Sequence, residues 1–348
     1  MPDTINISSL VRKNILEMEP YSSARDEYSG SASVYLDANE NPFNTPLNRY
    51  PDPGQQILKR KIASLKGQQV ENIFLGNGSD EGIDVLIRVL CEPGRDNVLT
   101  LDPSYGMYGV CAEINGVECR RILLKSNFSL DPDAVLEAVD EHTKLIFLCS
   151  PNNPTSNSLE REVMLKIIDA VTCMVVVDEA YIDFSNGPGL LPILSEKKNL
   201  VILQTLSKAW GLAGIRLGML FAHRELIGYL SAVKYPYNIN SLTIEAALEG
   251  LKETSQQRDW VREILEERGR MVKELESMDF VKMVHPSDAN FLLIRVDNPS
   301  ELYQFLISKG IIVRDRSGVP LCKGSLRITI GSKEENRVLI AALKTKQS

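Results

Sequence analysis

Short apolar runs alternate with segments of helical periodicity between about residues 70 and 220. The runs are NIFLG, NVLTLDP, KLIFLCSP, MVVVDEA and NLVILQT, and none of them alternates apolar with polar positions. Continuous apolar runs of this kind are typical of strands buried on both faces, as in a parallel sheet covered by helices. The pattern therefore predicts a large α/β domain with a mostly parallel sheet flanked by helices.

The remainder of the chain follows a different pattern. Residues 243–278 form an amphipathic, highly charged stretch that predicts a long helix leading to a second domain. The segments NFLLIRV, ELYQFLISKG, IIVRD and LRITIG then indicate a strand, a helix and two strands before a closing helix. This mixed order predicts a smaller α+β domain. We expect a large domain over 36–245 and a small domain over 246–348, completed by the N-terminal segment 1–35.

Composition and charge limit the possible functions. The chain has 348 residues, 43% of them hydrophobic, which is enough for two domains. Its net charge is −7, whereas nucleic-acid binding needs clustered Lys and Arg. No apolar run reaches the ~18 residues of a membrane span, and MPDTINISSLVRKN lacks the apolar stretch of a signal peptide. With six cysteines, no CxxC pair and three histidines, we expect a cytoplasmic protein without a metal centre.

Polar residues follow five of the predicted strands. In open α/β sheets, ligands bind beyond the carboxyl ends of the strands, so these residues are candidates for a common site. They are Tyr105 after NVLTLDPS, Asn153 after KLIFLC, Asp178 and Tyr181 after MVVV, Thr205, Ser207 and Lys208 after NLVILQ, and the loop GNGSDEG after NIFL.

The loop GNGSDEG opens a predicted helix near Ser79. Exposed backbone N–H groups and the helix dipole would make it an anion site. Its G-x-G-x-x-x-G spacing matches neither the dinucleotide fingerprint nor a Walker loop. A turn followed by a Ser or Asp cap is the alternative interpretation, and the loop gains weight only from the residues around it.

Lys208 lies in TLSKAWGLAGIRLG, directly after an apolar strand. An isolated lysine usually lies on the surface. Here three glycines permit close backbone approach, and Arg216 follows in the same segment. A lysine amine forms an imine with an aldehyde when burial and nearby cations depress its pKa. Lys208 is therefore a candidate for covalent attachment of a cofactor.

Asp178 ends a run of three valines, where a carboxylate is costly to bury unless it is paired. It is either a helix cap or ion-pair partner, or it pairs with a protonated pyridine nitrogen and keeps that ring an electron sink. Tyr181 would reach the phenolic oxygen of the same ring, and Tyr105 would stack on its face, although both are equally compatible with core packing. Asn153 is either a turn residue or a ring ligand.

Four segments in this order resemble the fold-type I pyridoxal-phosphate aminotransferases: SPNNPT, DEAY, TLSKAWGLAGIRLG and LRITIG. The resemblance extends from about residue 10 to 340. Within that superfamily, EPYSSARDEY, LDANENPF, RYPDP and LGNGSDE are similar to the histidinol-phosphate aminotransferases. One departure is Ser156, where the family usually has a glycine after Asn-Pro-Thr. We expect a locally altered loop and intact function.

The resemblance implies a pyridoxal phosphate cofactor bound to Lys208 as a Schiff base, with Lys208 later moving the substrate proton. It implies that Asp178 pairs with the pyridine nitrogen, that Asn153 and Tyr181 bind the ring oxygen, and that Tyr105 stacks on the ring. The residues that would hold the cofactor phosphate are Ser79, Asp80, Thr205, Ser207 and Arg216.

Substrate binding is implied in the same way. Arg327 resembles the arginine that binds the acidic end of the substrate, and Arg314 and Tyr21 resemble its helpers beside Asn153. Tyr50 resembles a residue that reaches the cofactor and substrate of the neighbouring subunit in a homodimer. The implied reaction is reversible amino transfer between L-histidinol phosphate or imidazole-acetol phosphate and glutamate or 2-oxoglutarate, in histidine biosynthesis.

Three alternatives remain at this point. The same scaffold serves decarboxylation of threonine phosphate, and it also serves aminotransferases for aromatic or broad sets of amino acids. A non-catalytic or nicotinamide-binding α/β protein is the third, and the missing G-x-G-x-x-G disfavours nicotinamide.

Overall fold

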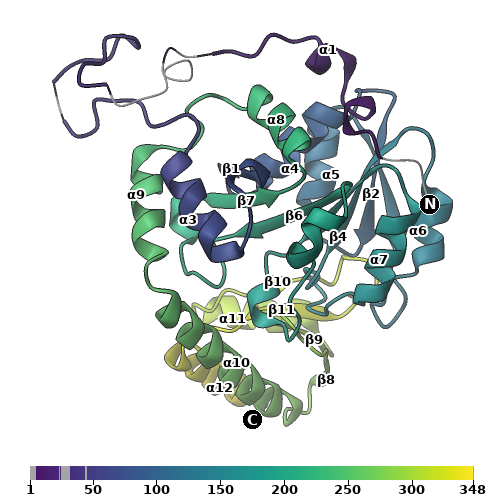
Figure 1. Ribbon diagram of the computed structural model, residues 1–348. Helices are drawn as coiled ribbons and strands as arrows, with labels where there is room; N and C mark the ends of the chain where they lie inside the picture. The colour runs from purple at the N-terminus through teal and green to yellow at the C-terminus, as the bar shows by residue number, and fades with distance from the viewer. Residues whose placement is uncertain (1–4, 23, 25–31, 44, 348) are drawn as a thin grey trace.

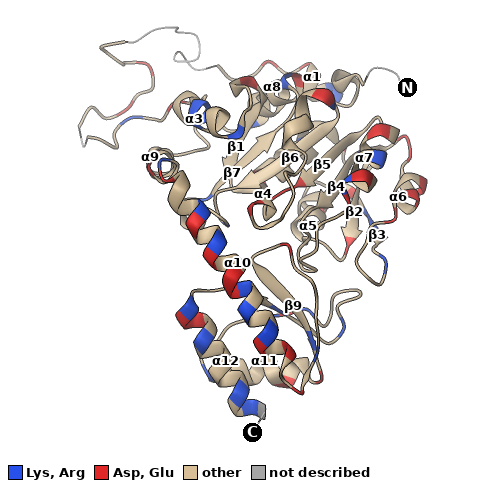
Figure 2. Ribbon diagram, turned by 60° about the horizontal axis from the view of Figure 1, so that its bottom comes forward, with Lys and Arg blue, Asp and Glu red and all other residues tan. Residues whose placement is uncertain are grey.

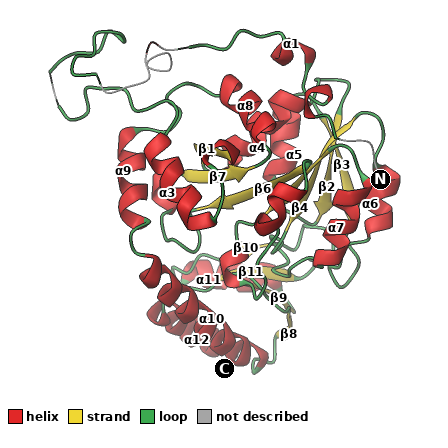
Figure 3. Cartoon of the chain, viewed as in Figure 1, coloured by secondary structure: helices red, strands yellow, loops and turns green. Residues whose placement is uncertain are grey.

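The computed structural model describes residues 5–22, 24, 32–43 and 45–347. Helices pack against two separate sheets, one of seven strands and one of four (Figures 1 and 3). The long helix α10 (Thr254–Glu276) connects the two parts, and Figure 2 shows acidic and basic residues along its length.

The larger sheet has the strand order β1-β7-β6-β5-β4-β2-β3. Its strands are β1 (Ile73–Asn77), β2 (Asn97–Asp102), β3 (Glu118–Leu123), β4 (Thr143–Cys149), β5 (Met174–Asp178), β6 (Leu200–Thr205) and β7 (Leu217–Phe221). Strand β7 is antiparallel to β1 and β6, and the other neighbours pair in parallel. The predicted mostly parallel sheet is therefore confirmed.

Both faces of this sheet are covered, which explains the uninterrupted apolar runs. In β4, Phe147 packs into one core cluster, and its neighbours Ile146 and Leu148 pack into the other. Helices α4 (Ser79–Leu90), α5 (Met107–Ile114) and α8 (Arg224–Val233) supply the first cluster. Helices α3 (Gln56–Lys66), α6 (Pro132–Ala138) and α7 (Arg161–Ala170) supply the second.

The smaller sheet is antiparallel, with the order β10-β11-β9-β8. Its elements are β8 (Val281–Val284), β9 (Phe291–Val296), α11 (Pro299–Ser308), β10 (Arg314–Asp315), β11 (Ser325–Thr329) and α12 (Lys333–Gln347), preceded by α9 (Ser241–Gly250) and α10. Leu292, Ile294 and Leu326 face a third cluster with α10, α11 and α12. The alternate residue Leu293 joins the core of the large domain, so one face of the small sheet is turned toward the large one.

The N-terminal segment differs from the expectation that residues 1–35 belong to the small domain. Its described part includes the turn Ile7–Ser9 and α1 (Lys13–Leu16). Ile7 and Val11 are buried in the cluster formed with α4 and α8, and the N–H of Arg12 donates to the Val89 oxygen at 3.0 Å. This part therefore packs on the large domain, because its apolar residues find buried partners there. The domain boundaries otherwise stay a prediction.

All six cysteines are free, and five are buried. Burial raises the pKa of the Cys111 and Cys322 thiols to about 11, so they stay protonated and behave as small apolar side chains. In the described part of the chain, no helix is both long and apolar enough to cross a membrane.

Candidate functional site

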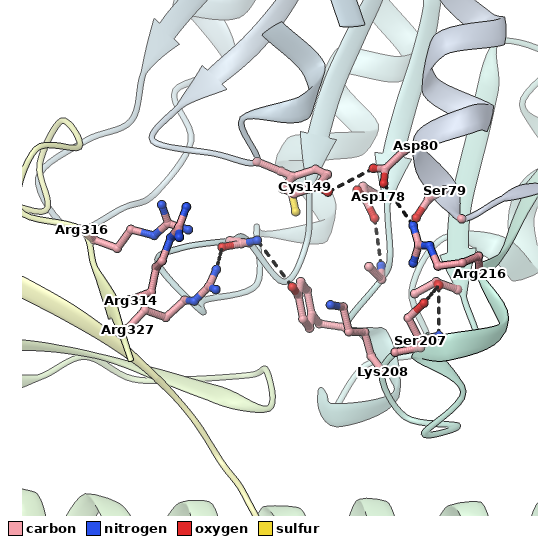
Figure 4. Close-up of a pocket in the computed structure, with 17 residues that line it drawn as sticks. Ser79, Asp80, Cys149, Asp178, Ser207, Lys208, Arg216, Arg314, Arg316 and Arg327 are labelled. Carbon is pink, nitrogen blue, oxygen red and sulfur yellow. Dashed lines mark hydrogen bonds and ion pairs between the residues drawn. The ribbon is translucent and has the colours of Figure 1, made fainter. Parts of the chain in front are cut away.

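A cavity of about 380 Å³ lies where the carboxyl ends of β4, β5 and β6 meet the small sheet. That volume lies within the roughly 300–1,000 Å³ typical of small-molecule sites. Its lining is Gly78, Ser79, Asp80, Tyr105, Cys149, Asn153, Asp178, Ala180, Tyr181, Thr205, Ser207, Lys208, Ala213, Arg216, Arg314, Arg316 and Arg327. Of the fourteen predicted site residues, twelve line this cavity, and Tyr21 and Tyr50 do not. In Figure 4, Arg314 and Arg327 approach the cavity from the small sheet, and Asp178, Lys208 and Arg216 approach it from the large one.

One end of the cavity, here called the phosphate-loop end, consists of Gly78, Ser79, Asp80, Thr205, Ser207 and Arg216. Helix α4 begins there after Gly78, which has φ +75 and gives the helix no side-chain cap. The first N–H groups of α4 are thus available to an anion. The N–H of Gly78 donates to the Arg216 oxygen at 2.8 Å. A Cβ at Gly218 would lie 2.2 Å from the Ser79 nitrogen, so the loop packs closely on β7.

The side chains at this end are already arranged. A guanidinium nitrogen of Arg216 lies 3.5 Å from the Asp80 carboxylate, which also accepts a hydrogen bond from the Tyr105 hydroxyl at 3.0 Å. The Thr205 hydroxyl accepts from the Ser207 N–H at 3.1 Å. Backbone N–H groups, the hydroxyls of Ser79, Thr205 and Ser207 and one guanidinium form a donor set that suits a phosphate.

Asp178 is buried at the end of β5, and its carboxylate borders the cavity. It accepts a hydrogen bond from the Tyr108 hydroxyl at 2.7 Å and one from the Ala180 N–H at 3.0 Å. Burial raises the pKa of Asp178, and the hydrogen bond from Tyr108 opposes that rise. A cationic group in the cavity would therefore gain a strong partner. Sequence reasoning missed Tyr108, because nothing in the pattern of α5 shows that its hydroxyl reaches β5.

Lys208 follows β6 and points into the cavity beside Tyr181, with 5.5 Å between its Nζ and the ring centroid. Burial lowers the pKa of Lys208, and the nearby charge of Arg327 lowers it further. The amine is thus more often neutral than in an exposed lysine, as imine formation requires. The amide of Asn153 donates to the Tyr181 hydroxyl at 3.5 Å.

The opposite end, here called the arginine end, consists of Arg314, Arg316 and Arg327. Arg314 pairs directly with Arg327 across β10 and β11, so the two side chains share a face of the small sheet. A guanidinium nitrogen of Arg327 donates to the Asn153 oxygen at 2.5 Å, and the group lies 5.3 Å from the Phe291 ring centroid. Among the described residues, none of the three arginines forms an ion pair with a carboxylate. Sequence reasoning missed Arg316, because the predicted strand IIVRD ends at Asp315, one residue before it. Its spacing of two residues from Arg314 is the signal that could have indicated a shared face.

Ser156 lies in the loop that follows Asn153. It is buried with φ +69, so the loop keeps the left-handed backbone that favours glycine. Its hydroxyl oxygen lies 2.6 Å from the Thr155 oxygen and 3.2 Å from the Pro286 oxygen, and its own carbonyl accepts from the Asp288 N–H at 2.7 Å. The Ser156 loop thus contacts the segment before β9, chiefly through its backbone.

Tyr21 and Tyr50 lie outside the cavity. Tyr21 is 71% exposed, and Tyr50 is 50% exposed while stacking on Tyr237 at 4.4 Å between ring centroids. The described residues 32–43, which precede Tyr50, extend away from the body of the molecule in Figure 1.

The cavity fits pyridoxal phosphate. Its phosphate-loop end offers donors for a phosphate, Lys208 offers an amine for an aldehyde, and Asp178 offers a carboxylate for a cationic ring nitrogen. The arginine end offers guanidinium groups for the acidic end of a substrate.

Comparison with known proteins agrees with this chemistry. The model of the family "Aminotransferase class I and II" matches residues 31–343. A histidinol-phosphate aminotransferase of Parabacteroides distasonis is 57% identical over 97% of this chain and 98% of its own. Among solved structures, a histidinol-phosphate aminotransferase from Clostridium acetobutylicum superposes with a TM-score of 0.80 at 26% identity, covering 86% of this chain and 91% of that one. An L-threonine-O-3-phosphate decarboxylase from Porphyromonas gingivalis gives 0.74 at 26% identity, with coverage of 86% and 91%.

The chain therefore belongs to the class I and II aminotransferase family. Within that family it is related to the histidinol-phosphate aminotransferases, because the 57% identity to one of them covers 97% of the chain. It has the fold of the fold-type I enzymes and is a pyridoxal-phosphate-dependent aminotransferase.

Proposed function

We propose that this enzyme transfers an amino group reversibly between L-histidinol phosphate and 2-oxoglutarate, giving imidazole-acetol phosphate and glutamate, as a step of histidine biosynthesis. The arginine end carries this proposal, because one cluster of guanidinium groups must accept a phosphate ester in one half-reaction and a carboxylate in the other. Guanidinium groups bind both anions through paired hydrogen bonds. The 57% identity to a relative of that name supports the same substrate pair.

The cofactor, when bound, supplies an electron sink for the negative charge that develops at the substrate Cα. We assign Lys208 to hold it covalently through Nζ. Asp178 would then pair with the ring nitrogen, Tyr105 would contact the ring, and Tyr181 with Asn153 would bind the ring oxygen. The phosphate-loop end would hold the phosphate.

Lys208 also moves the proton. With its amine free, Lys208 would be a base at Nζ, with a pKa lowered by burial and by Arg327. Nζ would take the proton from the substrate Cα and hold it until it is passed on to the cofactor. Both transfers use one positioned base, as general acid–base catalysis requires.

We propose a cytoplasmic homodimer in which Tyr50 reaches the neighbouring active site and Tyr21 contacts the substrate. Leu36, Phe43 and Leu47, which precede Tyr50 in the sequence, are largely exposed, and apolar exposure of this kind suits a subunit interface. The free cysteines suit a reducing compartment.

A half-reaction assay tests the function. Histidinol phosphate added to the purified yellow enzyme, without any acceptor, should bleach the absorption of the lysine-bound cofactor and yield imidazole-acetol phosphate. Borohydride treatment beforehand should fix the cofactor on the peptide that contains Lys208, and Lys208→Ala should neither react nor be labelled. Release of carbon dioxide from threonine phosphate, or faster turnover of phenylalanine than of histidinol phosphate, would contradict the proposal.

A further inference from the structure

Arg316 extends the pairing of the two strands that form the arginine end. Its N–H donates to the Ser325 oxygen at 2.9 Å, which continues the β10–β11 ladder beyond the pair Arg314 and Arg327. Side chains two residues apart on a strand share a face, so Arg314 and Arg316 point the same way. Figure 4 shows all three guanidinium groups at one end of the cavity.

The guanidinium of Arg316 lacks the contacts that normally accompany burial. Its Nε is buried and has no hydrogen-bond partner among the described residues. Burial and the charges of Arg327 and Arg314 lower the pKa of Arg316, because these groups oppose its charge. A buried unpaired donor among like charges is unfavourable unless an anion occupies the space in front of it.

The three arginines differ in how many of their guanidinium donors are already satisfied by protein or solvent. Arg327 already donates to Asn153 and lies against Phe291. Arg314 is exposed, which leaves it well solvated. Arg316 alone combines burial of its Nε with the absence of a protein acceptor in the described structure.

We infer that Arg316 is a specificity residue that binds the phosphate of the phosphorylated substrate and contributes little to binding of the dicarboxylate. This inference rests on the proposed function. A phosphate monoester carries a charge of about −1.5 to −2 near pH 7 and three acceptor oxygens. A carboxylate carries a single charge and two oxygens, which Arg327 and Arg314 suffice to bind. The third oxygen and the second charge of the phosphate require the third guanidinium.

Arg316→Gln tests the inference in the two half-reactions of the holoenzyme. The half-saturating concentration of histidinol phosphate should rise about 10- to 100-fold, as expected for loss of a charge-assisted hydrogen bond. That of glutamate should change by less than about threefold, and cofactor content should be unchanged. Arg316→Lys keeps the charge without the planar fork and should give an intermediate rise for histidinol phosphate.

The matched control is Arg295→Gln. Arg295 pairs with Ser325 on the same sheet, is exposed and does not line the cavity. Neither half-reaction should change in this variant. Equal effects of Arg316→Gln on both donors, or no effect on either, would overturn the inference.

Calorimetry with unreactive anions separates this inference from the proposed function. Propyl phosphate should bind wild-type holoenzyme and bind Arg316→Gln about tenfold or more weakly, whereas glutarate should bind both equally. If the wild type fails to convert histidinol phosphate, the proposed function is wrong. The titrations with propyl phosphate and glutarate then still test whether Arg316 binds a phosphate. Unchanged propyl phosphate binding in both Arg316 variants would refute its role regardless of turnover.

Discussion

The two ends of the cavity offer different kinds of hydrogen-bond donor to an anion. The phosphate-loop end uses backbone N–H groups at the start of α4, the hydroxyls of Thr205 and Ser207, and an arginine already paired with Asp80. The arginine end uses side chains from two short strands, without a carboxylate partner in the described structure. Backbone donors are fixed in place and suit a ligand that stays through many turnovers. Long side chains suit two different acids that alternate in each reaction cycle.

The largest expected effect concerns the backbone N–H groups of the phosphate-loop end and their contribution to cofactor affinity. In Gly218→Ala, the new Cβ would meet the Ser79 nitrogen at 2.2 Å. Cofactor affinity should fall at least about 100-fold. Overpacking against movable side chains costs about 1–3 kcal/mol, and here the new Cβ meets backbone atoms, which can move less. Reconstitution of cofactor-free protein, followed by fluorescence, measures it.

Gly214→Ala is the control for that substitution. Gly214 lies in the same segment, and apart from its two chain neighbours no atom of the described structure lies within 4 Å of a Cβ built there. Its cofactor affinity should match the wild type. Equal losses in both variants would show that the segment as a whole, rather than the close approach of Gly218 to Ser79, controls binding.

A smaller effect distinguishes the functions of the two ends. Arg327→Gln should lower kcat/KM about 10- to 100-fold for both histidinol phosphate and glutamate, since one charge-assisted contact to each substrate is lost. Its cofactor affinity should be unchanged. Arg216→Gln should show the reverse order, with weakened cofactor binding as the primary loss. Steady-state kinetics at saturating cofactor measure the first loss, and reconstitution titrations measure the second. Weakened cofactor binding in Arg327→Gln, or lowered kcat/KM at saturating cofactor in Arg216→Gln, would contradict this division.

The smallest effect is electrostatic and concerns Lys208. Its pKa is lowered first by burial and then by Arg327, and Arg216 contributes less. Removing a positive neighbour favours the protonated amine, so Arg327→Gln should raise the pKa of Lys208 and Arg216→Gln should raise it less. The pH dependence of acylation of Lys208 in cofactor-free protein, measured by mass spectrometry, should move to higher pH in that order. An unchanged profile in Arg327→Gln would show that burial alone sets the pKa.

That Asp178, Lys208 and the GNGSDEG loop share one cavity could be predicted from the sequence, because parallel strands bring their carboxyl ends to one edge. The assignment of the cofactor phosphate to Asp80, Thr205, Ser207 and Arg216 came from family resemblance and stays a prediction. The arginine end was predicted only through family resemblance, and Arg316 was missed, because sequence does not reveal how far the β10–β11 pairing continues. Tyr108 was missed since its hydroxyl crosses from α5 to β5. The position of Ile7 and Val11 on the large domain could not be predicted, because it depends on which apolar surface the other helices leave uncovered.

The loop around Ser156 has a consequence for which acids fit. It is hydrogen-bonded to Pro286 and Asp288, while Arg327 is bonded to Asn153 in the same loop. These bonds hold Arg327 beside the loop that follows Asn153, which favours substrates whose acidic group lies at a matching distance from the reacting Cα. The phosphorus of histidinol phosphate and the side-chain carboxyl carbon of glutamate are each three bonds from the reacting Cα. Histidinol phosphate and glutamate therefore place their acidic groups at the same number of bonds from the reacting Cα. The side-chain carboxyl carbon of aspartate is one bond closer, so we expect it to fall short of the arginine end.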